Sequence, residues 1–356
     1  MPFRRRRKRL LMRRILIVAV AVILVAALIG GVALIVHTIQ EKFPFSSADE
    51  PTIATTESTI TTTTTATTTT ATKPKITATT GPVYVTAEDY IADYVQAPRF
   101  LLYDRTADAP LYTRNINTVC APASLTKLMT AIVALETADL DTVITAGNEL
   151  YLLDPQSSRA GLYLGYRMTL RQALQALLLP SGNDAAYIIA AQLGHRMDES
   201  LSGQAAIDLF CRCMTEKARE LGCENTVFLN PDGIDKEGHQ TTASDLLKIT
   251  LHALQDPFIL ETVAKERITT TLLSGQTITF KSSNKLMRQS GSYAYEGTIG
   301  MKTGTTDGAG SCLISLVERD GRQLLCILMG ARNDKWRYRD TITLLDIGFN
   351  GFNGIY

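Results

Sequence analysis

Residues Ala121–Thr130 read APASLTKLMT, a proline-led entry into an apolar helix that carries Ser124 and Lys127 one turn apart. On a helix this spacing places the two side chains on one face, with about 5–6 Å between their Cβ atoms. A lysine in the first turn is electrostatically unfavourable, because a helix N-terminus carries a partial positive charge. That charge and desolvation both lower a lysine pKa, so the amine could accept a serine proton. The stretch is compatible with a serine nucleophile and a lysine base, but taken alone a serine N-cap followed by a solvated lysine is the commoner arrangement.

Two further motifs follow in order along the chain. They are Ser181-Gly182-Asn183, before a predicted helix, and Lys302-Thr303-Gly304, after a predicted strand. Taken alone, Ser181 could merely cap a helix, and Lys302 could be an edge-strand lysine that discourages aggregation. All three motifs in this order and inside these elements are hard to obtain by chance, which favours the catalytic interpretation.

The elements around the motifs predict an α+β fold with about five antiparallel strands that are interrupted by a long helical block. The predicted strands are 99–104, 109–113, 298–302, 312–317 and 323–329, the last two joined by Asp320-Gly321, a strong hairpin signal. The predicted helices are 124–137, 169–179, 185–191, 208–221, 242–252 and one after Lys335. This order favours helices gathered against one sheet.

The N-terminus carries a predicted membrane anchor. Residues 15–36 form an uncharged run of 22 residues, which is long enough to cross a hydrocarbon core of about 30 Å. The run is longer than a signal-peptide core, and no convincing A-x-A cleavage site follows it. Residues 1–14 are strongly basic, so the positive-inside rule predicts a cytoplasmic tail, an uncleaved signal-anchor, and a catalytic domain outside a bacterial cell membrane. A nucleic-acid patch is the alternative for the basic run, but the formal charge of the whole chain is only +1.

A threonine-rich stalk is predicted over residues 37–82. Between Thr52 and Thr80, 17 of 29 residues are threonine, with hardly any apolar residue to bury. Such a segment cannot offset its ordering entropy, so we expect it to be extended and disordered. Residues 83–356 form the predicted catalytic domain.

The three motifs and their context resemble the serine D-alanyl-D-alanine carboxypeptidases, which are low-molecular-mass penicillin-binding proteins. The resemblance covers roughly residues 83–352 and implies a DD-peptidase/β-lactamase-like fold with a mainly helical subdomain. Matching context includes Ala121-Pro122-Ala123, Asp184-Ala185-Ala186, Asn230-Pro231, Gly233, His239, Thr242, Asp245, Gly300, Thr306 and Gly310.

The resemblance implies a mechanism on peptidoglycan stem peptides that end in D-Ala-D-Ala. Ser124 attacks the carbonyl between the two D-alanines, Lys127 accepts the serine proton, and an acyl-ester forms. Ser181, held by hydrogen bonds with Lys127 and Lys302, relays the proton to the leaving amine, and Asn183 orients Lys127 and the substrate. Water then hydrolyses the ester. β-Lactam antibiotics, which mimic the substrate, should acylate the same serine.

The third motif is implied to bind the substrate. Lys302 supplies positive charge near the terminal carboxylate, with the Thr303 and Thr305 hydroxyls alongside and Gly304 between them. The backbone N–H groups of Ser124 and Thr305 would form the oxyanion hole. Some relatives carry histidine where this chain has Thr305, which affects the expected pH behaviour. Many relatives also carry a C-terminal β-rich domain and an amphipathic anchor; the N-terminal helix is expected to replace that anchor.

Three other kinds of protein could use similar residues: a class A β-lactamase, a DD-transpeptidase and a non-catalytic penicillin-binding sensor. A class A β-lactamase needs a glutamate-activated water, usually in a Glu-x-x-Leu-Asn stretch that this sequence lacks after Asn183. A DD-transpeptidase would use the same acyl-enzyme, and no residue decides between the two. A non-catalytic penicillin-binding sensor needs a cytoplasmic effector, for which about 14 residues leave no room.

No cofactor or metal is expected, because no histidine–cysteine cluster has zinc-site spacing. His239 is interpreted as a packing residue, since no carboxylate–His–Ser order supports a triad. Cys211 and Cys213 are two residues apart on a helix and cannot face one another. Cys312 and Cys326 are interpreted as small apolar strand residues.

Overall fold

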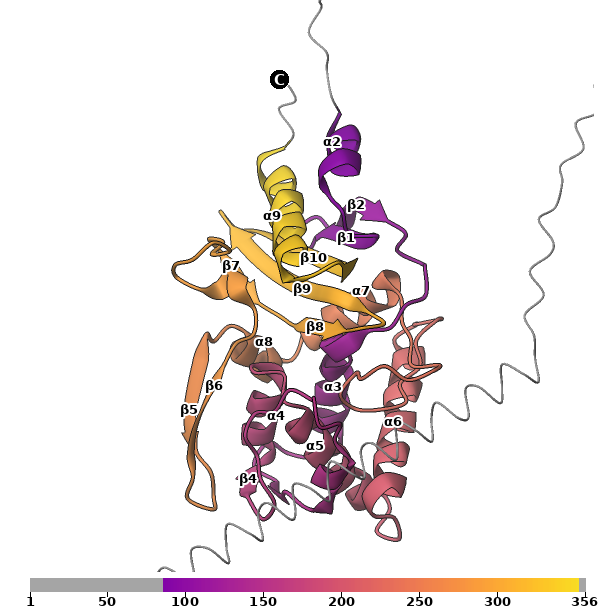
Figure 1. Ribbon diagram of the computed structural model, residues 1–356, viewed down its shortest axis with the longest axis vertical. Helices are drawn as coiled ribbons and strands as arrows, with labels where there is room; N and C mark the ends of the chain where they lie inside the picture. Colours follow the sequence, from indigo (N-terminus) through magenta and orange to yellow (C-terminus); the bar gives the residue numbers. More distant parts are fainter. Residues whose placement is uncertain (1–85, 352–356) are drawn as a thin grey trace, which may run out of the picture. The chain divides into compact units, whose positions relative to one another are not determined.

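The computed structural model describes residues 86–351 (Figure 1). The predicted tail, anchor and stalk, residues 1–14, 15–36 and 37–82, lie outside this range. Within the described range no helix combines the length and the apolarity that a membrane crossing requires.

A six-stranded antiparallel sheet forms the centre of the fold, in the order β2-β1-β10-β9-β7, with β8 also paired to β9. Its strands are β1 (Arg99–Asp104), β2 (Ala109–Arg114), β7 (Thr298–Gly300), β8 (Thr303–Thr306), β9 (Gly310–Arg319) and β10 (Arg322–Ala331). The fold is α+β, as predicted. The prediction of about five strands missed β8, because the predicted strand 298–302 is interrupted after Gly300, where Met301 has a φ of 98°.

The β9–β10 hairpin is closed as the sequence predicts. Asp320 and Gly321 have φ values of 50° and 77°, both left-handed, as a two-residue turn of the favoured hairpin type requires. Arg319 and Arg322 pair directly on either side of the turn. The turn therefore fixes the register of the two longest strands.

Alternating side chains of the sheet enter two separate cores, because successive residues of a strand point to opposite faces. On β10, Leu325 and Ile327 belong to the larger core, which the helical block fills. Leu324 and Leu328 belong to the smaller core, against α9 (Asp334–Asn350). The sheet thus separates α9 from the helical block (Figure 1).

The helical block lies between β2 and β7 in the sequence. Its elements are η1 (Ala123–Thr126), α3 (Lys127–Thr137), η2 (Asn148–Leu152), α4 (Leu170–Leu178), α5 (Asn183–Met197), α6 (Gly203–Glu220), α7 (Ala243–Ala253), α8 (Pro257–Val263) and η3 (Lys285–Met287). Thr169 caps α4 in a capping box with Gln172, and Thr242 caps α7 by accepting from the Asp245 N–H, as predicted. The α6 helix begins at Gly203 rather than at the predicted Asp208.

Three features were not predicted. A helix, α2 (Ala87–Tyr94), precedes the sheet, and two small hairpins flank the helical block. The hairpins pair β3 (Val143–Thr145) with β4 (Arg167–Thr169), and β5 (Arg267–Thr271) with β6 (Thr277–Lys281). The strands β3 and β4 have only three residues each, too few to show a period-two pattern. In contrast, β6 alternates as Thr-Ile-Thr-Phe-Lys, a strand pattern that the sequence analysis missed.

Candidate active site

Ser124 lies in the short 3₁₀ helix η1, and α3 begins only at Lys127. The sequence predicted both residues in the first turn of one α-helix. Ser124 and Lys127 nevertheless lie on one side of the chain, because residues three apart eclipse one another in a 3₁₀ turn. Lys127 Nζ lies 2.7 Å from Ser124 Oγ.

Lys127 is completely buried, and three oxygen atoms surround its amine. Nζ donates to Ser124 Oγ, to Asn183 Oδ1 and to the Asp232 carbonyl, each at 2.7 Å. Burial lowers the Lys127 pKa to about 8, although Asp232 and Asp184 act in the opposite direction. At pH 7 about a tenth of this amine is therefore neutral and able to accept the Ser124 proton, far more than for an ordinary lysine.

The second motif approaches Lys127 from the start of α5. Asn183 is the first residue of that helix, and Ser181 precedes it with a left-handed φ of 64°. The Ser181 hydroxyl accepts a hydrogen bond from Lys302 Nζ at 2.7 Å. The hydrogen bond between Ser181 and Lys127 that the resemblance implied is absent from the described residues; Lys127 binds Asn183 instead.

A buried carboxylate holds this motif in place. Asp184 is fully buried and accepts hydrogen bonds from the N–H groups of Ala160, Gly161 and Leu162 at 2.9–3.0 Å. Residues 158–162 form one loop, in which the Ser158 hydroxyl also donates to the Ser181 carbonyl at 2.7 Å. The loop and the motif therefore form one hydrogen-bonded unit.

The third motif runs into β8 beside the nucleophile. Lys302 is fully buried, and burial lowers its pKa well below the usual value, with further lowering from Lys127 and Arg337. A Cβ on Gly304 would lie 2.9 Å from the Ser124 nitrogen, so the β8 backbone passes directly against it. The Thr303 hydroxyl pairs with Ser283 at 2.6 Å.

Thr305 is exposed and borders the site next to Arg337, a residue that the sequence analysis missed. Arg337 comes from α9 and is 5% exposed. Its Nη1 donates to the Gly304 carbonyl and to the Thr305 hydroxyl, both at 3.0 Å. The available signal was a charged residue at a core position, since Thr341 and Leu344 share its helix face and are also buried.

Asp232 is the other residue that the motifs did not indicate. It is 2% exposed, and its carbonyl accepts from Ser124 Oγ at 3.3 Å as well as from Lys127. Burial raises the pKa of its carboxyl group. The Asn230–Gly233 turn therefore forms one wall of the nucleophile's environment.

Backbone strain gathers at the three motifs. Ala123, Ser181 and Met301 have φ values of 50°, 64° and 98°. Each either precedes a motif or belongs to one. Left-handed conformations are costly for residues with a side chain, and they occur most often where function constrains the backbone.

In the described part of the chain, no group of three or more histidine, cysteine, aspartate or glutamate side chains could hold a metal ion. The six cysteines are all free. Cys312 and Cys326 are fully buried in the sheet, as predicted, and Cys120 packs against Met329 with 3.8 Å between the sulfur atoms.

The amino-acid sequence is similar to a protein-family model and to several curated proteins, which carry the same description. A family model described as D-alanyl-D-alanine carboxypeptidase matches residues 85–333. The D-alanyl-D-alanine carboxypeptidase DacF of Bacillus subtilis is 28% identical over 261 residues, which cover 72% of this chain and 63% of that protein. A D-alanyl-D-alanine carboxypeptidase of Streptomyces sp. strain K15 is 30% identical over 249 residues, which cover 67% of this chain and 82% of that protein.

Solved structures share the fold. The Streptomyces DD-transpeptidase aligns with a TM-score of 0.65 at 29% identity, covering 72% of this chain and 98% of that chain. Penicillin-binding protein D2 from Listeria monocytogenes, in its ampicillin-bound form, aligns with a TM-score of 0.59 at 29% identity, covering 72% of this chain and 99% of that chain. The motifs, the fold and the extent of these matches together show that the chain belongs to the family of serine D-alanyl-D-alanine carboxypeptidases.

Proposed function

We propose that this chain is a membrane-anchored DD-carboxypeptidase, which removes the terminal D-alanine from peptidoglycan stem peptides through an acyl-enzyme on Ser124. The observation that carries the proposal is the buried Lys127 amine, 2.7 Å from Ser124 Oγ and with a pKa of about 8. Such an amine can activate a serine hydroxyl without a histidine.

In the acylation step, Ser124 Oγ attacks the carbonyl carbon of the penultimate D-alanine while Lys127 accepts its proton. The tetrahedral intermediate then collapses, and the bond to the terminal D-alanine nitrogen breaks. The proton that Lys127 accepted then passes to the leaving amine, which makes Lys127 neutral again. Ser181 is the proposed relay for this proton, and its hydroxyl, which now accepts from Lys302, must turn toward Lys127 to carry it. Water attacks the resulting ester and releases the shortened peptide, so that one peptide bond is hydrolysed in total.

Substrate binding uses the opposite wall of the site. The Ser124 and Thr305 N–H groups are proposed as the oxyanion hole, worth about 2.7–4 kcal/mol per donor in acyl transfer. The family resemblance implies Lys302 as the cation for the terminal carboxylate, but burial lowers the pKa of its amine and so favours the neutral form. Arg337 places its guanidinium, which also pairs with Asp334, beside the Thr305 hydroxyl. We assign the carboxylate to both residues, with Arg337 as the permanent charge.

The test uses a fragment of residues 83–356 and a pentapeptide that ends in D-Ala-D-Ala. We expect release of free D-alanine by the wild type and none by Ser124→Ala. Because that substitution removes only one oxygen atom, its thermal unfolding should match the wild type. Unchanged D-alanine release by Ser124→Ala would exclude the mechanism.

Two alternatives would use the same acyl-enzyme. A transpeptidase is suggested by the Streptomyces relative of known structure, which is named a DD-transpeptidase, and it differs only in that an amine attacks the ester. Adding an acceptor amine to the assay distinguishes them: a carboxypeptidase yields mainly the hydrolysed tetrapeptide, and a transpeptidase yields mainly the amine adduct. A non-catalytic sensor would bind penicillin at Ser124 but release no D-alanine.

β-Lactams are proposed as covalent inhibitors at Ser124, which agrees with the ampicillin-bound form of the Listeria relative. The location of the protein is also a proposal. It rests on the apolar run at residues 15–36 and the basic residues before it. We expect the full chain to remain in the membrane pellet after alkaline carbonate extraction and residues 83–356 alone to be released.

A further inference from the structure

His239 lies in the loop before α7 and is 3% exposed. Its Nδ1 accepts a hydrogen bond from the Leu229 N–H at 2.9 Å. A neutral imidazole with an accepting Nδ1 carries its proton on Nε2, and Nε2 lies 2.9 Å from the Thr126 hydroxyl. Nε2 therefore donates to Thr126, and the Thr126 hydroxyl donates in turn to the Ala123 carbonyl at 2.9 Å.

This chain of hydrogen bonds ends on the peptide group that contains the Ser124 nitrogen. A peptide group is planar and trans, so its C=O and N–H bonds point in opposite directions. Fixing the direction of the Ala123 carbonyl therefore also fixes the direction of the Ser124 N–H. That N–H is a proposed donor of the oxyanion hole, where small errors of direction weaken the stabilisation of the transition state.

The Ala123–Ser124 peptide has a conformation that needs support. Ala123 has a left-handed φ of 50°, which costs an alanine free energy relative to ordinary backbone. A Cβ on Gly233 would lie 1.9 Å from the Ala123 oxygen, so the Gly233 backbone packs tightly against that carbonyl. Gly304 leaves similarly little space on the side of the Ser124 nitrogen. The Thr126 hydroxyl is the side-chain group that bonds the confined carbonyl.

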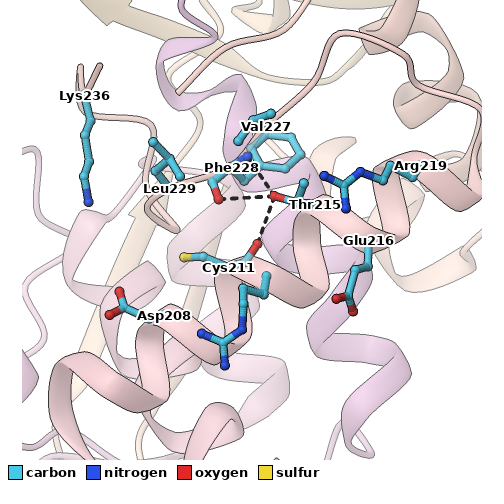
Figure 2. Close-up of a pocket in the computed structure, with 10 residues that line it drawn as sticks. Asp208, Cys211, Thr215, Glu216, Arg219, Val227, Phe228, Leu229 and Lys236 are labelled. Carbon is cyan, nitrogen blue, oxygen red and sulfur yellow. Dashed lines mark hydrogen bonds between the residues drawn. The ribbon is translucent and has the colours of Figure 1, made fainter. Parts of the chain in front are cut away.

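The other end of the chain of hydrogen bonds is anchored on α6. Figure 2 shows the Thr215 side chain against the backbone of Phe228, whose N–H donates to the Thr215 hydroxyl at 3.0 Å. The Phe228 ring also meets His239 edge-on, with 5.8 Å between ring centroids. Burial lowers the His239 pKa to about 4, so the imidazole is neutral at physiological pH and its single proton stays on Nε2.

We propose that His239 is a positioning residue: through Thr126 it orients the Ala123–Ser124 peptide, so that the Ser124 N–H points to the oxyanion. His239 neither touches the substrate nor transfers a proton in this scheme. The inference rests on the proposed function, because the oxyanion forms only when Ser124 attacks a substrate carbonyl.

The decisive variant is Thr126→Val, which keeps the shape of the side chain and removes the hydroxyl that links His239 to Ala123. We measure the rate constant of Ser124 acylation by a fluorescent penicillin, together with the dissociation constant of the initial complex. The acylation rate constant should fall about 10- to 100-fold, less than the roughly 10²–10³-fold that loss of a whole oxyanion donor costs. The dissociation constant should change little, because the Ser124 N–H acts mainly on the transition state.

Two controls separate positioning from folding. Thr126→Ser keeps the hydroxyl and should retain the acylation rate. Thr250→Val makes the same substitution at a fully buried threonine of α7, whose hydroxyl has no partner in residues 86–351. It should leave acylation unchanged. His239→Gln, which keeps a donor for Thr126, should lose less activity than His239→Leu.

The inference is overturned if Thr126→Val acylates as fast as the wild type. It is also overturned if the loss in Thr126→Val merely follows the fraction of folded protein, measured by thermal unfolding. Failure of the proposed function gives a different result: the wild type would then release no D-alanine from the pentapeptide, whether or not penicillin acylates Ser124.

Discussion

Lys127 is the residue on which the proposed acylation depends. Its amine must be neutral to accept the Ser124 proton, and its pKa is about 8 because burial disfavours the charged form. The rate constant for acylation should therefore rise about tenfold per pH unit below pH 8 and level off above it. Rate measurements with a fluorescent penicillin between about pH 6 and pH 9.5 test this, and a flat profile would contradict it.

Lys127→Arg provides the matching variant. Arginine keeps the positive charge but cannot lose its proton in a protein. Acylation should fall by about 10²–10⁴-fold at every pH, the usual contribution of a general base, and the rise toward pH 8 should disappear. A variant with substantial activity and an unchanged pH profile would assign the base to another group.

His239 makes a separate prediction about stability. Burial lowers its pKa to about 4 in the folded protein, against about 6.5 in the unfolded chain; Asp235 nearby raises it and Lys236 lowers it. Between these values the unfolded state binds more protons, so the free energy of unfolding should decrease as pH falls from about 6.5 to about 4. The shift corresponds to at most about 3 kcal/mol.

Urea unfolding at several pH values measures this effect. His239→Gln should lose less stability on acidification than the wild type, because glutamine does not titrate. His195→Gln changes an exposed histidine of α5 and should behave like the wild type. Equal acid sensitivity of the wild type and His239→Gln would show that His239 does not titrate in this range.

At the scale of the elements, helix caps and turns were the most predictable features. Thr169, Thr242 and the Asp320-Gly321 turn lie where the sequence placed them, because their signals depend only on neighbouring residues. The break between β7 and β8 could not be predicted. It depends on the contact of Gly300 with the backbone of Val263, a segment distant in sequence.

The loop that supports the second motif offers an element-scale prediction. Asp184 accepts from three consecutive backbone N–H groups, residues 160–162, and hydrogen bonds to a charged acceptor contribute about 1.5–3 kcal/mol each in favourable cases. Asp184→Asn keeps the size of the side chain but loses the charge. We expect an unfolding free energy lower by about 2–4 kcal/mol. We also expect slower acylation, because the Ser181 turn loosens.

Asp245→Asn is the matched control. Asp245 is also buried and accepts from the N–H groups of Glu224 and Asn225, but it lies away from the Ser181 turn. It should lose comparable stability in urea unfolding while its acylation rate, measured on the folded protein, stays closer to that of the wild type. Equal losses of acylation in both variants would remove any specific role of the Asp184 loop.

At the scale of the whole molecule, the site lies where three separate parts of the chain meet. Ser124 and Lys127 come from η1 and α3, Ser181 and Asn183 from the start of α5, and Lys302 from the approach to β8. The sequence predicted that these residues belong to one site, because each lies in a short motif that can be recognised from neighbouring residues and the three motifs occur in a fixed order. Arg337 has no motif, only the signal of a charged residue on the buried face of α9; its role arises from the position of α9 across the sheet, which no local pattern encodes.

Arg337 is therefore the subject of the last prediction. Its guanidinium binds the Gly304 carbonyl and the Thr305 hydroxyl and lies beside Asp334, so it reaches the edge of the site from the face that α9 covers. Arg337→Leu removes the permanent positive charge proposed for the substrate carboxylate. The KM for a D-Ala-D-Ala peptide should rise about 10- to 100-fold, in line with the loss of one charge-assisted contact of about 1.5–3 kcal/mol.

Arg337→Lys keeps the charge but not the planar fork, so it should recover only part of the loss. Arg339→Leu, at an exposed arginine two residues along the same helix, should leave KM unchanged. A substrate analogue that lacks the terminal carboxylate gives the sharpest comparison. It should be cleaved equally poorly by the wild type and Arg337→Leu, because the contact that distinguishes the two proteins is absent. If Arg337→Leu discriminates against that analogue as strongly as the wild type does, the carboxylate is bound elsewhere, and Lys302 becomes the remaining candidate.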